Sequence, residues 1–171
     1  MKTLLLLRHA KSDWGDPALR DADRPLAPRG VKAAPRIARY LAAHGPVPDH
    51  VICSAARRAQ ETWELIAPHL APTPSVEFTR ALYMARPADM LGLVHAAPPD
   101  AACVMLVGHN PGMEMLAAQL AGPASDPDAL AMLRHKYPTA ALAVVDFDAE
   151  AWTDVGAPGA LRAFVRPRDL V

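Results

Sequence analysis

The sequence predicts an α/β protein, a three-layer α/β/α sandwich whose central sheet is mostly parallel and has an antiparallel C-terminal edge. Short, continuous apolar runs alternate with longer segments in which apolar residues recur at helical spacing. Such runs are typical of parallel strands, because helices cover both faces of a parallel sheet. The last two runs, 140–147 and 160–165, have no clear helix between them. This connection predicts that they pair antiparallel at one edge of the sheet.

The first predicted strand contains the four leucines at 4–7, and Arg8 and His9 follow it directly. In an open parallel sheet, ligands bind beyond the carboxyl ends of the strands, which is where these two side chains are expected. They could equally form a solvated polar cap on a core strand. The polar loop over 13–25 is expected at the same end of the sheet, where long loops often carry function.

A helix is predicted over 28–44, because its apolar residues recur on one side and Gly45-Pro46 follows it. Pro35 lies within this pattern, and it should either kink the helix or shift its start. The residues expected on the core-facing side are Val31, Ala34, Ile37, Ala38 and Leu41.

The chain continues to alternate between strands and helices up to residue 120. Prolines and helix-capping residues mark the predicted boundaries. The expected elements are a strand at 51–53, a helix that Ser54 caps and that ends near 67, a strand at 75–78, a helix at 88–97, a strand at 102–107, and a helix at 111–120 that Asn110 caps.

Composition limits the classes of function. The 171 residues predict a single domain, residues 1–171, and the formal net charge of zero disfavours a nucleic-acid partner. No apolar stretch approaches the roughly 20 residues of a membrane span, and the apolar start is too short for a signal peptide. We therefore expect a cytoplasmic protein without a membrane partner. Cys53 and Cys103 lie inside apolar runs, so they are expected to be buried and reduced.

Polar residues suited to binding an anion follow three of the predicted strands. These groups are Arg8-His9, then Ser54 with Arg57 and Arg58, then Gly108-His109-Asn110. If the strands are parallel neighbours, the three groups meet at one edge of the sheet. The helix dipole disfavours a cation in the first turn by about 0.3–1 kcal/mol, unless a bound anion lies between the cation and the backbone amides. The spacing leaves open which of the two adjacent arginines points inward.

Two histidines at strand ends, accompanied by arginines, favour phosphoryl transfer over a structural role for each. A neutral imidazole can attack phosphorus, while arginines and a second, protonated imidazole neutralise the charge on the equatorial oxygens. Arginine also offers the paired donors that suit phosphate. A cationic pocket of this kind would repel metal ions, and we expect neither a metal nor another cofactor.

These motifs resemble those of the histidine phosphatase superfamily, which has the phosphoglycerate mutase-like fold. The similar stretches are Leu7-Arg8-His9-Ala10, Arg58-Ala59 with Thr62, and Gly108-His109-Asn110-Pro111. Further stretches resemble the SixA-type phosphohistidine phosphatases, and they are Arg8-His9-Ala10-Lys11-Ser12, Arg24-Pro25-Leu26 with Arg29-Gly30, Tyr137-Pro138-Thr139 and Arg166-Pro167-Arg168-Asp169-Leu170. The resemblance extends over nearly the whole chain, with Ala10 where the superfamily usually has glycine.

The resemblance implies that His9 is a nucleophile that becomes phosphorylated, and that Arg8, Arg58 and His109 bind the phosphate. It decides between the two adjacent arginines in favour of Arg58, and it suggests that Ser12 also faces the phosphate. The implied reaction is metal-independent hydrolysis of a phosphoramidate or phosphomonoester. The implied partner is a phosphate-bearing substrate, such as a histidine-phosphotransfer domain that carries phosphohistidine.

The region where related ester hydrolases usually place an acid, to protonate the leaving oxygen, contains no carboxylate here. Residues 79–88 have Ala81-Leu82-Tyr83 at that place. The imidazole of phosphohistidine leaves easily once it is protonated, so the absence favours phosphohistidine as substrate. Four aspartates of the 13–25 loop could still supply a proton, namely Asp13, Asp16, Asp21 and Asp23. A small-molecule phosphomonoesterase of the same superfamily and a non-catalytic phosphoprotein-binding module stay open as alternatives.

Overall fold

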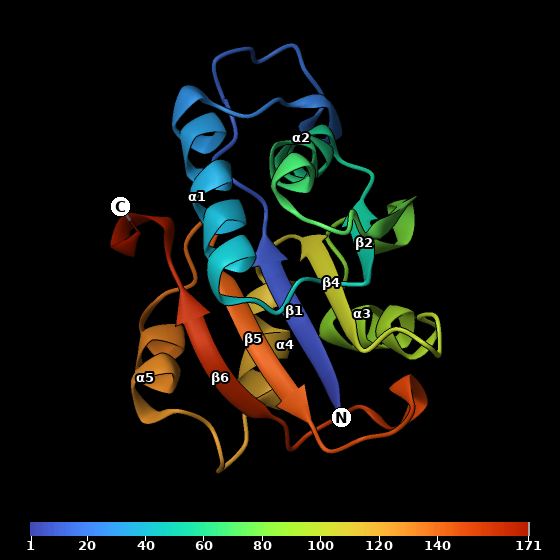
Figure 1. Ribbon diagram of the computed structural model, residues 1–171. Helices are drawn as coiled ribbons and strands as arrows, with labels where there is room; N and C mark the ends of the chain where they lie inside the picture. Colours follow the sequence, from blue (N-terminus) through green and yellow to red (C-terminus); the bar gives the residue numbers. More distant parts are fainter. Residues whose placement is uncertain (171) are drawn as a thin grey trace.

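The computed structural model describes residues 1–170 and contains a six-stranded sheet between two layers of helices (Figure 1). The strands are β1 (Lys2–Arg8), β2 (His50–Ser54), β3 (Ser75–Thr79), β4 (Cys103–Gly108), β5 (Leu142–Phe147) and β6 (Ala160–Val165). Their order across the sheet is β3-β2-β4-β1-β5-β6. The first four strands of this order are parallel, whereas β5 is antiparallel to β1 and β6 is antiparallel to β5. The predicted fold class is confirmed.

Two apolar cores lie on opposite faces of the sheet, and the leucines of β1 contribute to both. Leu5 and Leu7 pack with α1 and α2, whereas Leu4 and Leu6 pack with α3, α4 and α5. Successive side chains of a strand point to opposite faces, so a strand that is covered on both sides is apolar throughout. The helices are α1 (Pro28–His44), α2 (Arg57–Ile66), α3 (Pro87–His95), α4 (Gly112–Leu120) and α5 (Pro127–His135).

Helix α1 has the predicted bounds, and Pro35 lies inside it without shifting its start. Four of the five predicted core residues are buried, but Val31 is exposed and Gly30 is buried in its place. The cause is a close approach between α1 and the segment that follows β1. A Cβ at position 30 would lie 2.3 Å from the carbonyl oxygen of Lys11, so only glycine fits there.

The starts of two helices differ from the prediction. Ser54 is the last residue of β2, and α2 begins three residues later with Ala56 as its N-cap. Ser54 Oγ still accepts a hydrogen bond from the backbone N–H of Ala56 at 3.2 Å, which stabilises the turn between strand and helix. Pro111, rather than Asn110, is the N-cap of α4. The Asn110 side chain nevertheless accepts a hydrogen bond from the backbone N–H of Glu114 at 3.1 Å.

Helix α5 was not expected from the sequence; Asp126 caps it by accepting a hydrogen bond from the backbone N–H of Ala129 at 2.9 Å. Cys53 and Cys103 are both buried and free, as predicted. Within residues 1–170, no helix is both long and apolar enough to cross a membrane.

Candidate active site

The strand order brings the three predicted polar groups to one edge of the sheet. β1 and β2 both pair with β4, so that Arg8 lies opposite Gly108, and Cys53 lies opposite Val107. The residues that follow these positions therefore emerge side by side. The imidazole rings of His9 and His109 have centroids 5.1 Å apart. The expectation that the strand ends meet is confirmed by this geometry.

Arg58 lies between the two histidines. Its Nε is 3.3 Å from Nε2 of His9, and its Nη2 is 3.4 Å from Nδ1 of His109. Arg58 is only 4% exposed, whereas the side chain of Arg57 is 54% exposed and pairs with Glu61 at 2.8 Å. Side chains in the first turn of a helix lean toward its N-terminus, which carries the Arg58 guanidinium over the end of β2. Arg58 is therefore the inward arginine.

Hydrogen bonds hold His9 in one tautomer. The Arg58 guanidinium can only donate, so Nε2 of His9 accepts and bears the lone pair. Nδ1 then carries the proton and donates to the carbonyl of Ala10 at 2.8 Å. The pKa of His9 is lowered to about 4, chiefly by burial and also by the positive charges of Arg58 and Arg8, against the opposing effect of the Ala10 hydrogen bond. At neutral pH the imidazole is therefore uncharged and can act as a nucleophile.

His109 is held in the opposite tautomer. Its Nδ1 accepts from Arg58 Nη2, and its Nε2–H donates to Oγ of Ser54 at 2.7 Å. Burial, followed by the charges of His9 and Arg58, lowers the pKa of His109 to about 3. In the free site His109 is therefore neutral at neutral pH, whereas the sequence predicted a protonated second imidazole. Its unprotonated nitrogen faces the same guanidinium as that of His9. Both histidines thus turn a lone pair toward Arg58.

The C-terminal part of the chain fixes Arg8. The carbonyl of Tyr137 accepts from Arg8 Nη1 at 2.8 Å and from Asn110 Nδ2 at 3.2 Å, which joins the ends of β1 and β4. The hydroxyl of Tyr137 donates to the carbonyl of Leu6. Arg8 Nε is buried and has no hydrogen-bond partner within residues 1–170. An unpaired buried donor costs about 1–3 kcal/mol, and an anion could satisfy it.

Asp21 is the one member of the four loop aspartates that the structure brings to Arg58. Its Oδ2 is 2.9 Å from Arg58 Nη2 and accepts a hydrogen bond from the hydroxyl of Tyr83, and its Oδ1 is 3.1 Å from Arg24 Nη1. The hydrogen bond from Tyr83, and then that from Arg58, lower the pKa of Asp21, so the carboxylate is ionised at neutral pH. Sequence reasoning could not choose Asp21, because only the folding of the loop over α2 selects it.

Two buried hydroxyls connect the site to its surroundings. Oγ1 of Thr62 donates to the carbonyl of Arg58 at 2.7 Å and accepts from the backbone N–H of Ala10 at 3.0 Å. Thr62 thereby fixes α2 against the segment that carries the nucleophile candidate. Ser12 Oγ accepts from Arg24 Nη2 at 2.6 Å and keeps its own proton available. A contact of Ser12 with phosphate stays a prediction.

The site presents two guanidinium groups and two neutral imidazoles to one small volume. This set suits a tetrahedral anion, because the arginine donors match its oxygens. The lone pair of an imidazole can attack the central atom of the anion or accept a proton. Within the described residues, no three His, Cys, Asp or Glu side chains gather in a way that could hold a metal ion. The arrangement can therefore bind a phosphoryl group next to an uncharged nitrogen nucleophile.

Comparisons with known proteins identify relatives of the chain. The model of the histidine phosphatase superfamily (branch 1) matches residues 4–83, which include His9 and Arg58. The chain is 35% identical over 165 residues to an uncharacterized protein of Mycobacterium tuberculosis, covering 95% of this chain and 100% of that one. The structure assigned as phosphohistidine phosphatase SixA from Nakamurella multipartitia has 32% identity and a TM-score of 0.83, covering 97% of this chain and 96% of that one.

A second structure supports the same relationship. The protein assigned as phosphohistidine phosphatase SixA from Agrobacterium tumefaciens has 34% identity and a TM-score of 0.81, and the match covers 97% of this chain and 98% of that one. Together with the fold and the site, these likenesses define a hydrolase of the phosphatase class. The chain belongs to the histidine phosphatase superfamily and, within it, to the SixA type.

Proposed function

We propose that the protein is a phosphohistidine phosphatase, which hydrolyses a P–N bond through a phospho-His9 intermediate and without a metal ion. The observation that carries the proposal is the unprotonated Nε2 of His9, which faces Arg58 while Nδ1–H is held by the Ala10 carbonyl. The relatives from Nakamurella and Agrobacterium are assigned to the same activity, which supports a phosphohistidine substrate.

The phosphoryl group would bind among Arg8, Arg58 and His109. Once phosphate displaces the contacts of Arg58 Nη1 and Nη2 with Asp21, Arg58 can donate two parallel N–H groups to its oxygens. The unpartnered buried Nε of Arg8 supplies a third donor. A bound phosphate dianion would raise the pKa of His109, because a nearby negative charge favours the protonated imidazole. Protonated at Nδ1, His109 would donate a further hydrogen bond to a phosphoryl oxygen.

In the first step, the lone pair of His9 Nε2 forms a bond to phosphorus as the substrate's P–N bond breaks. The electron pair of that bond stays on the departing imidazole, which leaves neutral because its other nitrogen is already protonated. His9 then carries the phosphoryl group on Nε2 and the proton on Nδ1. The Ala10 carbonyl stabilises this cationic ring through the hydrogen bond from Nδ1.

In the second step, water attacks phosphorus and the P–Nε2 bond breaks. The electron pair returns to Nε2 of His9, and the proton of the attacking water leaves with the phosphate or passes to solvent. The phosphorylated ring is a good leaving group, since Nδ1–H keeps it cationic until the bond breaks. This step regenerates the tautomer that the structure shows.

The surroundings of the site explain why a P–N bond suits it better than an alkyl ester. An alkoxide needs a proton as it leaves. Asp21 is ionised at neutral pH, and its hydrogen bond raises the pKa of Tyr83, so neither side chain readily provides that proton. A protonated phosphohistidine brings its own proton to the reaction.

The test compares a phosphohistidine peptide, an aryl phosphate and an alkyl phosphate, each with and without a chelator. We expect hydrolysis of the phosphohistidine peptide to be fastest, to survive the chelator and to disappear in His9→Ala. The matched control is His69→Ala, which removes an exposed imidazole outside the site and should leave the rate unchanged.

The outcomes separate the alternatives. Preferred hydrolysis of the alkyl phosphate would indicate a small-molecule phosphomonoesterase. Binding of the peptide without turnover would indicate a phosphoprotein-binding module. A radiolabelled phosphoenzyme that survives acid rather than alkali would contradict phospho-His9, because a phosphorylated imidazole loses its phosphate in acid.

A further inference from the structure

A basic groove lies beside α1 and is not part of the candidate active site. It has a volume of about 380 Å³, and seven of the 18 lysines and arginines of the chain line it. No Asp or Glu of residues 1–170 lines it. Six of its cations are exposed to solvent, and they are Lys11, Arg29, Lys32, Arg36, Lys136 and Arg168. The chain as a whole is neutral, so this concentration of positive charge is local.

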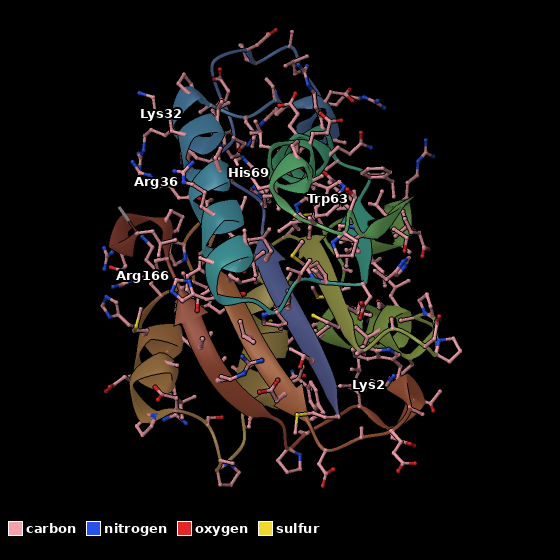
Figure 2. The ribbon with its side chains drawn as sticks, viewed as in Figure 1. Lys2, Lys32, Arg36, Trp63, His69 and Arg166 are labelled. Atoms are coloured by element: carbon pink, nitrogen blue, oxygen red, sulfur yellow. The ribbon has the colours of Figure 1, made fainter. Side chains whose placement is uncertain are left out.

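Helix α1 contributes a row of three cations to the groove. Arg29, Lys32 and Arg36 are spaced by three and four residues, which places them on one face of the helix. Figure 2 shows Lys32 and Arg36 extending from α1 on the side where Arg166 also lies. None of these three groove-lining cations pairs with an Asp or Glu of residues 1–170. Their mutual repulsion disfavours the helix slightly, so an external anion would stabilise the row.

The seventh cation differs from the others. Arg166 is half-buried and binds the carboxylate of Asp169 through two hydrogen bonds of 2.6 and 3.0 Å. Its charge is therefore largely balanced within the chain. The charge available to a partner comes from the six exposed cations.

The groove adjoins the segment that carries His9. Lys11 lies two residues beyond the nucleophile candidate, and its carbonyl accepts a hydrogen bond from the backbone N–H of Ala27 at 2.8 Å, directly before α1. Pro138 also lines the groove, and it follows Tyr137, whose carbonyl holds Arg8. A molecule seated in the groove would therefore lie next to the site.

We propose that the groove docks an acidic surface of the substrate protein that lies next to the phosphohistidine. This surface carries a row of Asp or Glu side chains about one helical turn apart. This inference rests on the proposed function and names the kind of substrate protein that the site accepts. From Arg29 to Arg36 the row spans about 10 Å at 1.5 Å per residue, which matches two turns of an acidic helix. Charge complementarity of this kind steers the encounter and sets partner choice.

The shape and chemistry of the groove disfavour other anions. The three groove cations of α1 extend over about two helical turns, whereas a small anion would need donors that converge on one point. None of the side chains that line it is Phe, Tyr or Trp, so a single-stranded nucleic acid would find no stacking platform. A protein surface that carries several carboxylates fits the observed spacing best.

The test uses two phosphohistidine peptides that differ only in their flank, one with glutamates at one-turn spacing and one with glutamines at the same positions. We expect Lys32→Glu/Arg36→Glu to raise KM for the acidic peptide about tenfold without changing kcat, because two attractions become repulsions. The glutamine peptide should be unaffected. Arg39→Glu is the matched control, since Arg39 is exposed on the same helix but does not line the groove.

Salt gives a second readout. Raising the ionic strength from about 0.01 M to about 0.15 M shortens the screening length from about 30 Å to about 8 Å. For the wild-type protein, kcat/KM of the acidic peptide should fall over this range, and the charge-reversed variant should lose that dependence. A neutral variant, Lys32→Gln/Arg36→Gln, should show an intermediate effect.

Binding of the unphosphorylated peptides by calorimetry separates the two proposals. If wild type binds the acidic peptide more tightly than the glutamine peptide but hydrolyses neither phosphorylated form, the docking surface stands and the proposed function fails. If both peptides are hydrolysed with equal KM, the proposed function stands and the docking surface is wrong. Preferential, groove-dependent binding of an RNA oligomer or of anionic vesicles would also overturn the docking of an acidic protein.

Discussion

Asp21 acts as an internal anion on Arg58, so neutralising it should strengthen phosphate binding. Its carboxylate lies 2.9 Å from Arg58 Nη2, which is a donor that the phosphoryl group would also use. Inorganic phosphate must therefore displace this contact when it binds. Asp21→Asn keeps the size of the side chain and removes its negative charge, which lowers the cost of the displacement.

The expected size follows from the geometry of the pair. A hydrogen bond between charged groups contributes about 1.5–3 kcal/mol where it is shielded from water. The side chain of Asp21 is 47% exposed, although that of Arg58 is only 5% exposed, so solvent screening reduces the value to about 1 kcal/mol. This free energy corresponds to about a fivefold lower inhibition constant for inorganic phosphate.

The assay measures competitive inhibition of phosphohistidine hydrolysis by inorganic phosphate, and phosphate binding by calorimetry. Asp23→Asn is the control, because Asp23 lies in the same short turn and pairs with the exposed Arg20 instead. If Asp21→Asn binds phosphate with wild-type or weaker affinity, Asp21 does not compete for Arg58. A large loss of kcat with unchanged phosphate affinity would instead give Asp21 a part in the reaction.

Three further predictions concern stability and positioning. In the folded state the pKa values of His9 and His109 are lowered to about 4 and about 3. The unfolded state therefore binds more protons than the folded state below about pH 6.5. As a result, the free energy of unfolding should be lower by about 2 kcal/mol per histidine near pH 5 than at neutral pH. Urea titrations check this, and a pH-independent stability would contradict it. Thr62→Val leaves the Ala10 N–H unpaired, so the free energy of unfolding should fall by about 1–3 kcal/mol. In steady-state kinetics the variant should lower kcat more than it raises KM, and an unchanged kcat would refute a positioning role for Thr62. Gly30→Ala should destabilise by about 1–3 kcal/mol in thermal unfolding, whereas Gly92→Ala, with open space around it, should not; equal effects would refute the close approach.

The meeting of the three strand ends could be predicted because it depends on simple rules. Each apolar run ends at a polar group, and parallel strands place their carboxyl ends at one edge. The sequence did not reveal the order of the strands in the sheet. The structure shows that β1 and β2 both pair with β4, which brings the three strand ends together. The choice of Arg58 over Arg57 needed the resemblance, because the helical spacing of adjacent residues does not fix which one faces the core.

Other features could not be predicted because they depend on contacts between distant segments. The choice of Asp21 follows from Tyr83 and Arg58, which are about 40 to 60 residues away along the chain. Val31 was expected in the core because its periodicity is correct. The close approach of Gly30 to Lys11 turns α1 so that Val31 faces solvent, and no local pattern encodes that contact.

The protonation states of the site residues bear on which bond of a phosphorylated substrate the proposed reaction would break. Before substrate binds, every polar neighbour of Arg58 in the site is a base without a proton to give, because the imidazoles are neutral acceptors toward it and Asp21 is an ionised carboxylate. The proton that His109 gains when phosphate binds is donated to a phosphoryl oxygen and not to the leaving group. A pocket of this kind binds a phosphoryl dianion and attacks it readily, but it does little for a departing alkoxide. The more basic the leaving group, the slower the first step should be. On the proposed function, selectivity for a phosphoramidate would arise from the lack of a ready proton donor for the leaving group rather than from any group that recognises nitrogen.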